Sequence, residues 1–587
     1  MMPGSELIKR FKNDRATQLI LIGLLIGVLS GFAAVFYRWL ISAMQGLFFG
    51  IGENPLVVAQ LAPWWRRLLM PTLGLLLVAL IGKFLLKKEG ASHGVPDVME
   101  AMQAGKPLPR RIILIRSLTS AITIGSGGST GREGPIAHIG ATVGSAISGL
   151  FKKKGDLAKT MISCGAAGGI AATFNAPIAG ALFALEILHG DVAIRHFTPI
   201  VISSVIATVV SNSLLREVTG LTALSSGQLT FHLRSGWEIP IYLGMALLLG
   251  AACILFMHSL ERVEEAFEKL KLPGYVKAIL GGLIMAVMAL GFPQLHGFSN
   301  YTTINAVLEG QYVWYLIAAL GFLKMLSTSV TLGAGGTGGV FAPSLFIGAM
   351  LGNTFGYFVH RVFPDSTATA GSYALVGMGA LMAGVTGAPL TSVVLIFELS
   401  GKYTIILPLM IACAVTTILV QVFMKGSIFT RPLIKKGIFY GEKRNVLRRM
   451  RVKDIVKREF HGVTPRTKLR EVLDLLSSSR QYAFPVLNEK DELEGIVSLQ
   501  DFQEAVARPE VVDVLVVGEL MTSSVSTALP ENTLEEALLK IGDRNIEYLP
   551  VLESADSRKM IGLVSRRDIL SCYNQEVKEM IEESRNG

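Results

Sequence analysis

The chain has 587 residues, of which 51% are hydrophobic and only 17% are charged, with a formal net charge of +10. Soluble chains carry about 25% charged residues, so this composition excludes a wholly soluble protein and indicates one that crosses a membrane several times. The positive charge does not indicate nucleic-acid binding, because the basic clusters lie between or just after apolar segments, as they do in cytoplasmic loops. These clusters are Lys87–Lys88, Lys106–Arg111, Lys152–Lys154 and Arg444–Arg451.

The apolar segments predict a helical membrane domain over residues 17–442, with halves at about 17–214 and 237–437 separated by a more polar stretch. We expect residues 1–16 to be a cytoplasmic N-terminus without a cleavable signal, because basic residues precede an apolar run too long for one. Several apolar runs are shorter than a full span and are broken by Gly or Pro, which requires surrounding protein or a cavity. The runs lie at about 17–49, 68–86, 111–124, 134–150, 157–171, 176–189, 197–214, 239–258, 276–294, 312–330, 341–360, 372–386, 389–400 and 404–424.

A glycine-rich stretch, Gly125–Pro135, places the charged pair Arg132–Glu133 between apolar segments. A charge at membrane depth costs at least ~2.5–3.5 kcal/mol, so such a pair indicates function. Glycines let the backbone turn tightly and expose its N–H groups, and Pro135 suits the first turn of a helix. A glycine-rich loop that enters a helix N-terminus is an anion-binding arrangement.

The stretch is repeated 208 residues later at Gly333–Pro343, and nine of the twenty positions in 125–144 and 333–352 are identical. Glu186 follows Ala176–Pro177 as Glu398 follows Ala388–Pro389, at nearly the same offset. The membrane region is therefore an internal duplication. Repeated halves whose broken helices direct their N-termini at the membrane midplane are typical of anion transporters. Because the two glutamates are repeated, we interpret them as helix-end or interface carboxylates.

Gly131-Arg132-Glu133-Gly134-Pro135 resembles the GREGP motif of the CLC chloride channels and chloride/proton antiporters, and Gly339–Pro343 resembles their GxFxP motif. The resemblance covers most of residues 17–437. It implies two inverted-repeat halves, transport of chloride or a related monovalent anion, and a homodimer in which each subunit has its own pathway. It implies that Glu133 is the gate, whose carboxylate competes with the anion and swings away when protonated. The anion-binding positions that it implies are Arg132, Gly134, Val340, Phe341, Ala342, His93 and Phe429, with main-chain N–H groups central at Val340 and Phe341.

Three positions depart from the family pattern. The GSGxP motif reads Ser92-His93-Gly94-Val95-Pro96, so that His93 replaces the hydroxyl donor, and Phe429 replaces a tyrosine near the last membrane helix. Both changes leave chloride or nitrate selectivity open. Ile187 occupies the family position of an internal proton-transfer glutamate, and an isoleucine cannot transfer protons. This weakens the hypothesis of chloride/proton antiport and favours that of a passive anion channel, and both alternatives stay open.

After residue 440 the composition becomes charged and soluble, and a second duplication appears at an offset near 65. Phe484–Leu487 matches Leu549–Leu552, and Gly495–Asp501 matches Gly562–Asp568. Each copy reads as helix–strand–strand–helix and resembles a CBS domain, at 450–508 and 515–575, so the second fold class is a soluble α+β pair. In that family such pairs often bind adenine nucleotides, which implies a site at Ser498, Asp501, Ser565 and Asp568. The alternative is that both serines are only helix caps.

Other classes fit the sequence poorly. A membrane metalloprotease needs His-Glu-x-x-His, which none of the nine histidines provides, and a magnesium transporter needs clustered intramembrane acids. We therefore expect no enzyme activity, no metal site and no required cofactor, with adenine nucleotide as the candidate ligand of the CBS pair. The four scattered cysteines indicate buried thiols. We expect a multi-pass protein of the cell (inner) membrane, with the CBS pair in the cytoplasm.

Overall fold

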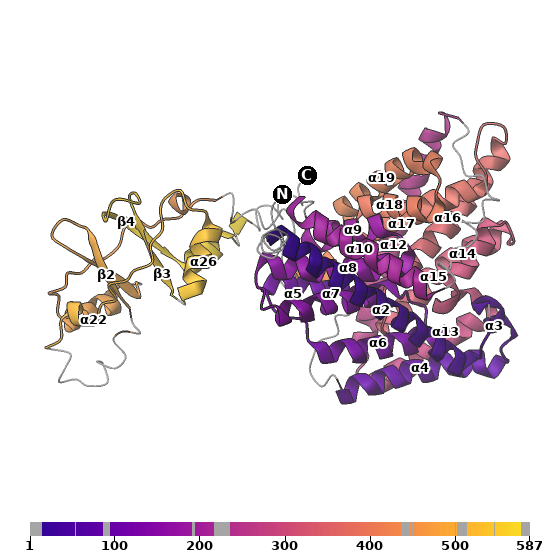
Figure 1. The fold of residues 1–587 in the computed structure, drawn as a ribbon, viewed down its shortest axis with the longest axis horizontal. Helices are drawn as coiled ribbons and strands as arrows, with labels where there is room; N and C mark the ends of the chain where they lie inside the picture. The colour runs from indigo at the N-terminus through magenta and orange to yellow at the C-terminus, as the bar shows by residue number, and fades with distance from the viewer. Residues whose placement is uncertain are drawn as a thin grey trace, which may run out of the picture. The chain divides into compact units, whose positions relative to one another are not determined.

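The computed structural model (Figure 1) describes residues 15–52, 54–85, 94–190, 194–215, 235–435, 450–479, 481–498, 514–544 and 546–573, with 447, 501, 575 and 576. The chain folds into two compact units, Met1–Ile438 and Phe439–Gly587. The first is helical, and the second combines short helices with two small antiparallel sheets. The predicted fold class, a helical membrane domain followed by an α+β pair, is confirmed.

Each half of the first unit is a series of helices of unequal length. In the described part of the chain, eight helices are long and apolar enough to cross a membrane, and four more apolar helices are shorter than 18 residues. The helices of the first half are α2 Arg15–Phe49, α3 Pro55–Leu61, α4 Trp64–Leu85, α5 Val95–Ala104, α6 Arg110–Gly125, α7 Glu133–Leu150, α8 Asp156–Phe174, α9 Pro177–Phe183, the π-helical η1 Ala184–His189 and α10 Ile194–Leu214. Those of the second half are α12 Glu238–Lys269, α13 Gly274–Gly291, η2 Pro293–Leu295, η3 Gly297–Ser299, α14 Asn300–Leu308, α15 Trp314–Gly333, α16 Phe341–Val362, α17 Ala370–Thr386, α18 Pro389–Ser400, η4 Tyr403–Ile405, α19 Ile406–Met424 and α20 Thr430–Lys435.

The predicted apolar runs fall on these helices, whereas α3, α5 and α14 lie where the sequence predicted no apolar run. These helices have only 7, 10 and 9 residues. In α14, polar residues such as Asn300, Thr303 and Asn305 are buried against protein. Polar side chains inside protein leave no apolar periodicity to read, which is why hydropathy missed this helix.

Equivalent glycines bring equivalent helices into backbone contact in the two halves. A Cβ at Gly140 of α7 would lie 2.1 Å from the carbonyl oxygen of Gly165 in α8. Its counterpart Gly348 of α16 would place a Cβ 2.3 Å from the carbonyl oxygen of Gly377 in α17. Small residues at such crossings let membrane helices pack at close range, where dispersion and not hydrophobicity holds them. The sequence duplication is thus accompanied by the same helix packing in both halves, with α7 against α8 and α16 against α17.

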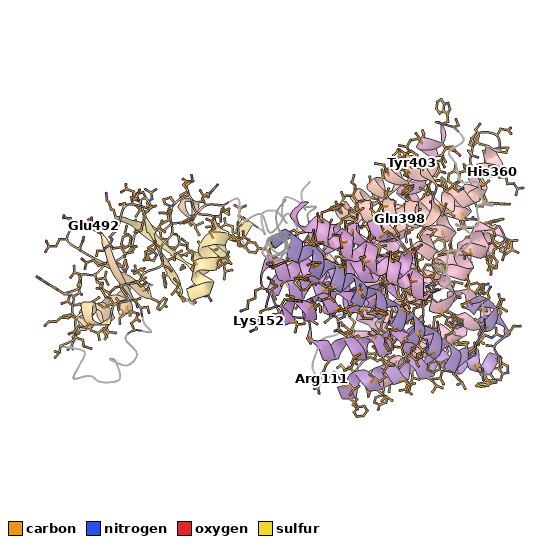
Figure 2. The ribbon with its side chains drawn as sticks, viewed as in Figure 1. Arg111, Lys152, His360, Glu398, Tyr403 and Glu492 are labelled. Carbon is orange, nitrogen blue, oxygen red and sulfur yellow. The ribbon has the colours of Figure 1, made fainter. Side chains whose placement is uncertain are left out.

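Each half also completes a helix of the other. Glu186 accepts hydrogen bonds from the main-chain N–H groups of Leu390 (3.0 Å) and Thr391 (2.8 Å) and from the Thr391 hydroxyl (2.6 Å), at the start of α18. Glu398 of α18, labelled in Figure 2, accepts from the N–H groups of Ile178 (3.0 Å) and Ala179 (2.7 Å) at the start of α9. Helix N-termini leave N–H groups without intrahelical partners, and a carboxylate satisfies them and suits the helix dipole. The interpretation of both glutamates as helix-end carboxylates is confirmed.

In the second unit, each copy has an amphipathic helix and an antiparallel strand pair. Both sheets have the same register, with Ala483 opposite Ser498 and Tyr548 opposite Ser565. The elements are η6 Val452–Asp454, α22 Leu469–Ser478, β1 Ala483–Leu487, β2 Leu493–Ser498, α25 Val517–Leu520, α26 Leu534–Arg544, β3 Tyr548–Leu552 and β4 Met560–Ser565, with a further helix at 566–573.

The two copies exchange their leading segments. Val452, at the start of the first copy, is buried in the core of the second, and Val517, at the start of the second, is buried in the core of the first. Main-chain hydrogen bonds join Lys457 to Leu563 in both directions at 3.0 Å, and Thr522 pairs with Ile496 in the same way. Neither copy can complete its core alone, so the pair is one folding unit.

We predict that Gly140→Ala lowers the stability of the membrane unit by about 1–3 kcal/mol, because the added methyl group forces α7 away from α8. Gly149→Ala is the matched control on the same helix, since a Cβ there meets nothing within 4 Å. It should cost nothing, because alanine favours helix. Thermal unfolding of both variants in detergent measures the difference, and equal melting temperatures would contradict this account of the packing.

Candidate functional site

The two glycine-rich loops are bonded to each other. Gly131 and Gly339 exchange both main-chain hydrogen bonds, each with an N···O distance of 2.7 Å. Two further bonds repeat at the offset of 208 residues: the Ser129 N–H donates to the Thr331 hydroxyl and the Thr337 N–H to the Thr123 hydroxyl, both at 3.1 Å. The loops of the two halves therefore form one pseudosymmetric structure.

Glycine is required in these loops for two reasons. Gly127 and its counterpart Gly335 have φ values of +104° and +94°, a region that other residues rarely adopt. A Cβ at Gly339 would lie 2.7 Å from the Gly134 nitrogen, so a side chain there would separate the loops. Since α7 begins at Glu133 and α16 at Phe341, each two residues beyond the bridge, the bridge brings both helix N-termini together.

Glu133 has no exposed surface and lies between these helix ends. Its Oε2 accepts from the Ala342 N–H of α16 at 3.4 Å, and the Arg132 Nε lies 3.9 Å from its Oε1. The Tyr301 hydroxyl of α14 donates to the same Oε1. A Cβ at Gly131 would lie 2.3 Å from Glu133 Oε2, so that glycine makes the room which the carboxylate occupies. A negative group thus lies on a main-chain donor of the opposite half, as a bound anion would.

The other expected anion-binding residues gather beside it. Phe341 is buried, and its ring centroid lies 5.6 Å from those of Phe183 and Phe429. Val340, also buried, immediately precedes α16. The structure therefore brings Arg132, Glu133, Gly134, Val340, Phe341, Ala342 and Phe429 to one region.

His93 lies outside the described residues, but the next residue is informative. Gly94 has a φ of +104°, and a Cβ there would lie 3.8 Å from main-chain atoms of Gly134. Gly94 is also the N-cap of α5, which continues with Val95 and Pro96. The start of a third helix therefore reaches the region where the other two meet.

Sequence reasoning missed Tyr301, which contacts both Glu133 and its neighbour: the Arg132 guanidinium carbon lies 5.0 Å from the Tyr301 ring centroid. No motif marks this tyrosine, since it lies in a polar stretch between two apolar runs. The repeat could have found it, because 208 residues before Tyr301 stands His93.

In the second unit, the four expected nucleotide-binding residues line one cavity of about 1420 Å³ between the two CBS copies. The Asp501 carboxylate accepts from the N–H (2.6 Å) and hydroxyl (2.8 Å) of Ser498. Asp568 accepts in the same way from Ser565, and its other oxygen lies 2.7 Å from the Lys457 Nζ. Burial raises the pKa of Asp568, but the hydrogen bonds from Lys457 and Ser565 outweigh it and hold the pKa below its usual value. The serines are therefore bonded to these aspartates, and both pairs face this cavity.

The chain matches the family Voltage gated chloride channel over residues 73–421 and the family CBS domain over residues 452–508 and 517–574. A ClcB-like protein of Ralstonia nicotianae is 34% identical over 422 residues, which are 71% of this chain and 97% of that protein. The Voltage-gated ClC-type chloride channel ClcB of Escherichia coli strain SMS-3-5 is 32% identical over 422 residues, which are 71% of this chain and 99% of the relative.

Solved structures of the same fold include a slow cyanobacterial Cl⁻/H⁺ antiporter, with a TM-score of 0.64 and 23% identity, covering 71% of this chain and 97% of the other. A eukaryotic CLC transporter has a TM-score of 0.62 and 20% identity, covering 94% and 97% of the two chains. At this level of identity the likeness concerns the fold alone.

Proposed function

The chain belongs to the CLC family of chloride channels and transporters, which are not enzymes, and we propose that it carries chloride or a related monovalent anion along a pathway gated by Glu133. The observation that carries the proposal is the buried Glu133 carboxylate at the paired helix N-termini, on the Ala342 N–H group. This region of the membrane unit offers main-chain donors and helix dipoles to a negative group.

The gating step follows from competition for these donors. While Glu133 is ionised, its carboxylate occupies the donors that an anion would use. Protonation removes the charge and most of the attraction to the helix ends, so the side chain leaves and the anion enters. Anion flux therefore rises as the pH falls.

Proton coupling is the point on which two forms of this function differ. Ile187, at the family position of the internal proton-transfer glutamate, is buried and apolar. A hydrocarbon side chain carries no proton, which supports a passive pathway, with a chloride/proton antiporter as the alternative. Chloride-driven proton uptake by protein reconstituted in liposomes, with the reversal potential, separates the two: a passive pathway moves no protons.

Glu133→Gln should make anion flux less dependent on pH, because the amide imitates the protonated acid at every pH. It should also abolish any proton uptake. Chloride efflux from liposomes between pH ~5 and ~8 is the measurement, with Glu238→Gln, a buried glutamate at the start of α12, as the control. If the Glu133 variant keeps the wild-type pH dependence, Glu133 is not the gate.

We propose that His93 supplies a side-chain donor to the anion, in place of the family's hydroxyl, while Phe429 lines the site with its ring alone. Imidazole titrates in the range of pH ~5–8, and its protonated form offers two donors and a full charge. His93→Ser should therefore change the chloride/nitrate flux ratio and its pH dependence. If Ser92→Ala alone changes the ratio, the neighbouring hydroxyl is the ligand.

We further propose that the CBS pair binds an adenine nucleotide in the cavity between its copies and thereby regulates transport. The cavity joins aspartates, suited to ribose hydroxyls, with basic Lys457, Arg458 and Arg567 and aromatic Tyr482 and Tyr548. Binding in the micromolar range, about −8 kcal/mol, is expected. Calorimetry of the full chain with ATP, ADP and AMP should give heat that the Asp501→Ala/Asp568→Ala variant loses. If the wild-type protein gives no heat of binding with ATP, ADP or AMP, the CBS pair is a structural module.

The same family membership supports two proposals, one about assembly and one about location. We propose a homodimer in which each subunit has its own pathway. We propose location in the cell (inner) membrane, with the N-terminus and the CBS pair in the cytoplasm, where the basic loops also belong.

A further inference from the structure

Tyr301 is the one side-chain hydroxyl that the described structure bonds to the Glu133 carboxylate. It is the second residue of α14, in the half of the membrane unit opposite to Glu133. Tyr301 is partly exposed, whereas Glu133 is fully buried.

The internal repeat gives this tyrosine a defined place. Tyr301 stands 40 residues before Phe341, as His93 stands 40 residues before Glu133. Each position adjoins the start of a short helix, α14 or α5. The two halves thus each direct the beginning of a short helix at the paired loops, and in the second half that helix supplies a phenol.

Arg132 and Tyr37 also lie near this carboxylate. The Arg132 guanidinium carbon lies 5.0 Å from the Tyr301 ring centroid, a cation–π distance, and its Nε lies 3.9 Å from Glu133 Oε1. From α2, Tyr37 faces the same charged pair, but its hydroxyl bonds to the Ser120 hydroxyl at 2.7 Å. Among the titratable groups that face Glu133 in the described structure, Tyr301 is thus the one whose proton points at the carboxylate.

Without this phenol, Glu133 would keep weaker contacts. The Ala342 N–H lies 3.4 Å away, at the long end of hydrogen bonding, and Arg132 is beyond it. A hydrogen bond to an ionised group is stronger than one between neutral groups, and it stabilises the ionised form specifically. The same hydrogen bond stabilises protonated, neutral Glu133 less.

We propose that Tyr301 is the positioning residue that holds the ionised Glu133 carboxylate in the anion path and so sets the pH at which the pathway opens. The inference rests on the proposed gating role of Glu133. Opening requires that the hydrogen bond between the Tyr301 hydroxyl and the Glu133 carboxylate break. Protonation of Glu133 weakens this bond and so releases the side chain. Tyr301 thus acts through Glu133.

Tyr301→Phe keeps the ring and its contact with Arg132 but removes the donor. Because the ionised acid alone loses stabilisation, the gate should open with fewer protons in solution. The pH of half-maximal chloride flux in liposomes should rise by about 1–2 units, which is the size of one hydrogen bond to a charged group expressed as a shift of titration. Flux at the acid end of the profile, where the gate is already open, should remain near the wild-type value.

Tyr373→Phe is the matched control, because the Tyr373 hydroxyl also donates to a buried glutamate, Glu238, at 3.3 Å. It should leave the pH profile unchanged. In the Glu133→Gln background, Tyr301→Phe should add nothing to the flux profile. A profile that Tyr301→Phe does not shift, in a protein where Glu133→Gln reduces the pH dependence, overturns the inference and leaves the gating role intact. If Glu133→Gln itself has no effect, the proposed function fails first.

A second substitution covers the case in which Tyr301→Phe does not fold. Incorporation of 3-fluorotyrosine at position 301 replaces one ring hydrogen with fluorine. The phenol then becomes more acidic and a stronger hydrogen-bond donor. The profile should then move in the opposite direction, to lower pH. A shift to higher pH, or none, contradicts the proposal.

Discussion

The membrane unit depends on one pair of hydrogen bonds, those between the main chains of Gly131 and Gly339. They join two loops that are 208 residues apart in sequence and align the starts of α7 and α16 on one region. The N-terminus of a helix carries a partial positive charge and free N–H donors. Its attraction for an anion is weak when the helix end is single and is screened when it is exposed to water. Two such ends, brought together inside protein and away from water, form a site whose electrostatics are not diluted by solvent.

The same constraint explains the composition of the loops. Side chains at Gly131, Gly338 or Gly339 would occupy space held by Glu133 Oε2, the Thr130 side chain or the Gly134 backbone. The glycines therefore make two things possible at once: the close approach of the loops and the folding back of an acid onto the donors. A charged residue is tolerated at this depth because Tyr301, Arg132 and Ala342 all face it. The cost of burying this charge is thus offset by the contacts that surround it.

Much of this could be read from the sequence, because duplication repeats its signals. The glycine-rich stretches, the Glu186 and Glu398 pair and the CBS copies each appear twice, and the structure places each pair as equivalents. Hydropathy did not find the short helices α5 and α14, since α5 has only 10 residues and α14 buries polar residues such as Asn300 and Thr303. Tyr301 could have been predicted from the sequence by adding the 208-residue offset of the loops to His93, although the residue type differs between these two positions. The exchange of Val452 and Val517 between the CBS copies leaves no mark in sequence, because both residues look like ordinary core valines.

The reciprocal capping of α9 by Glu398 and of α18 by Glu186 makes each half of the membrane unit depend on the other. A single half inserted alone in a membrane would carry a carboxylate without donors and a helix start without an acceptor, and both are costly in hydrocarbon. Two identical copies that face each other would satisfy both needs at once, through an interface in which each subunit gives what it receives. Half-length chains of this kind would therefore need to associate as a self-complementary pair. In the present chain the same contacts lie within one molecule, so the halves can differ at other positions, such as Glu133 and Phe341, without losing them.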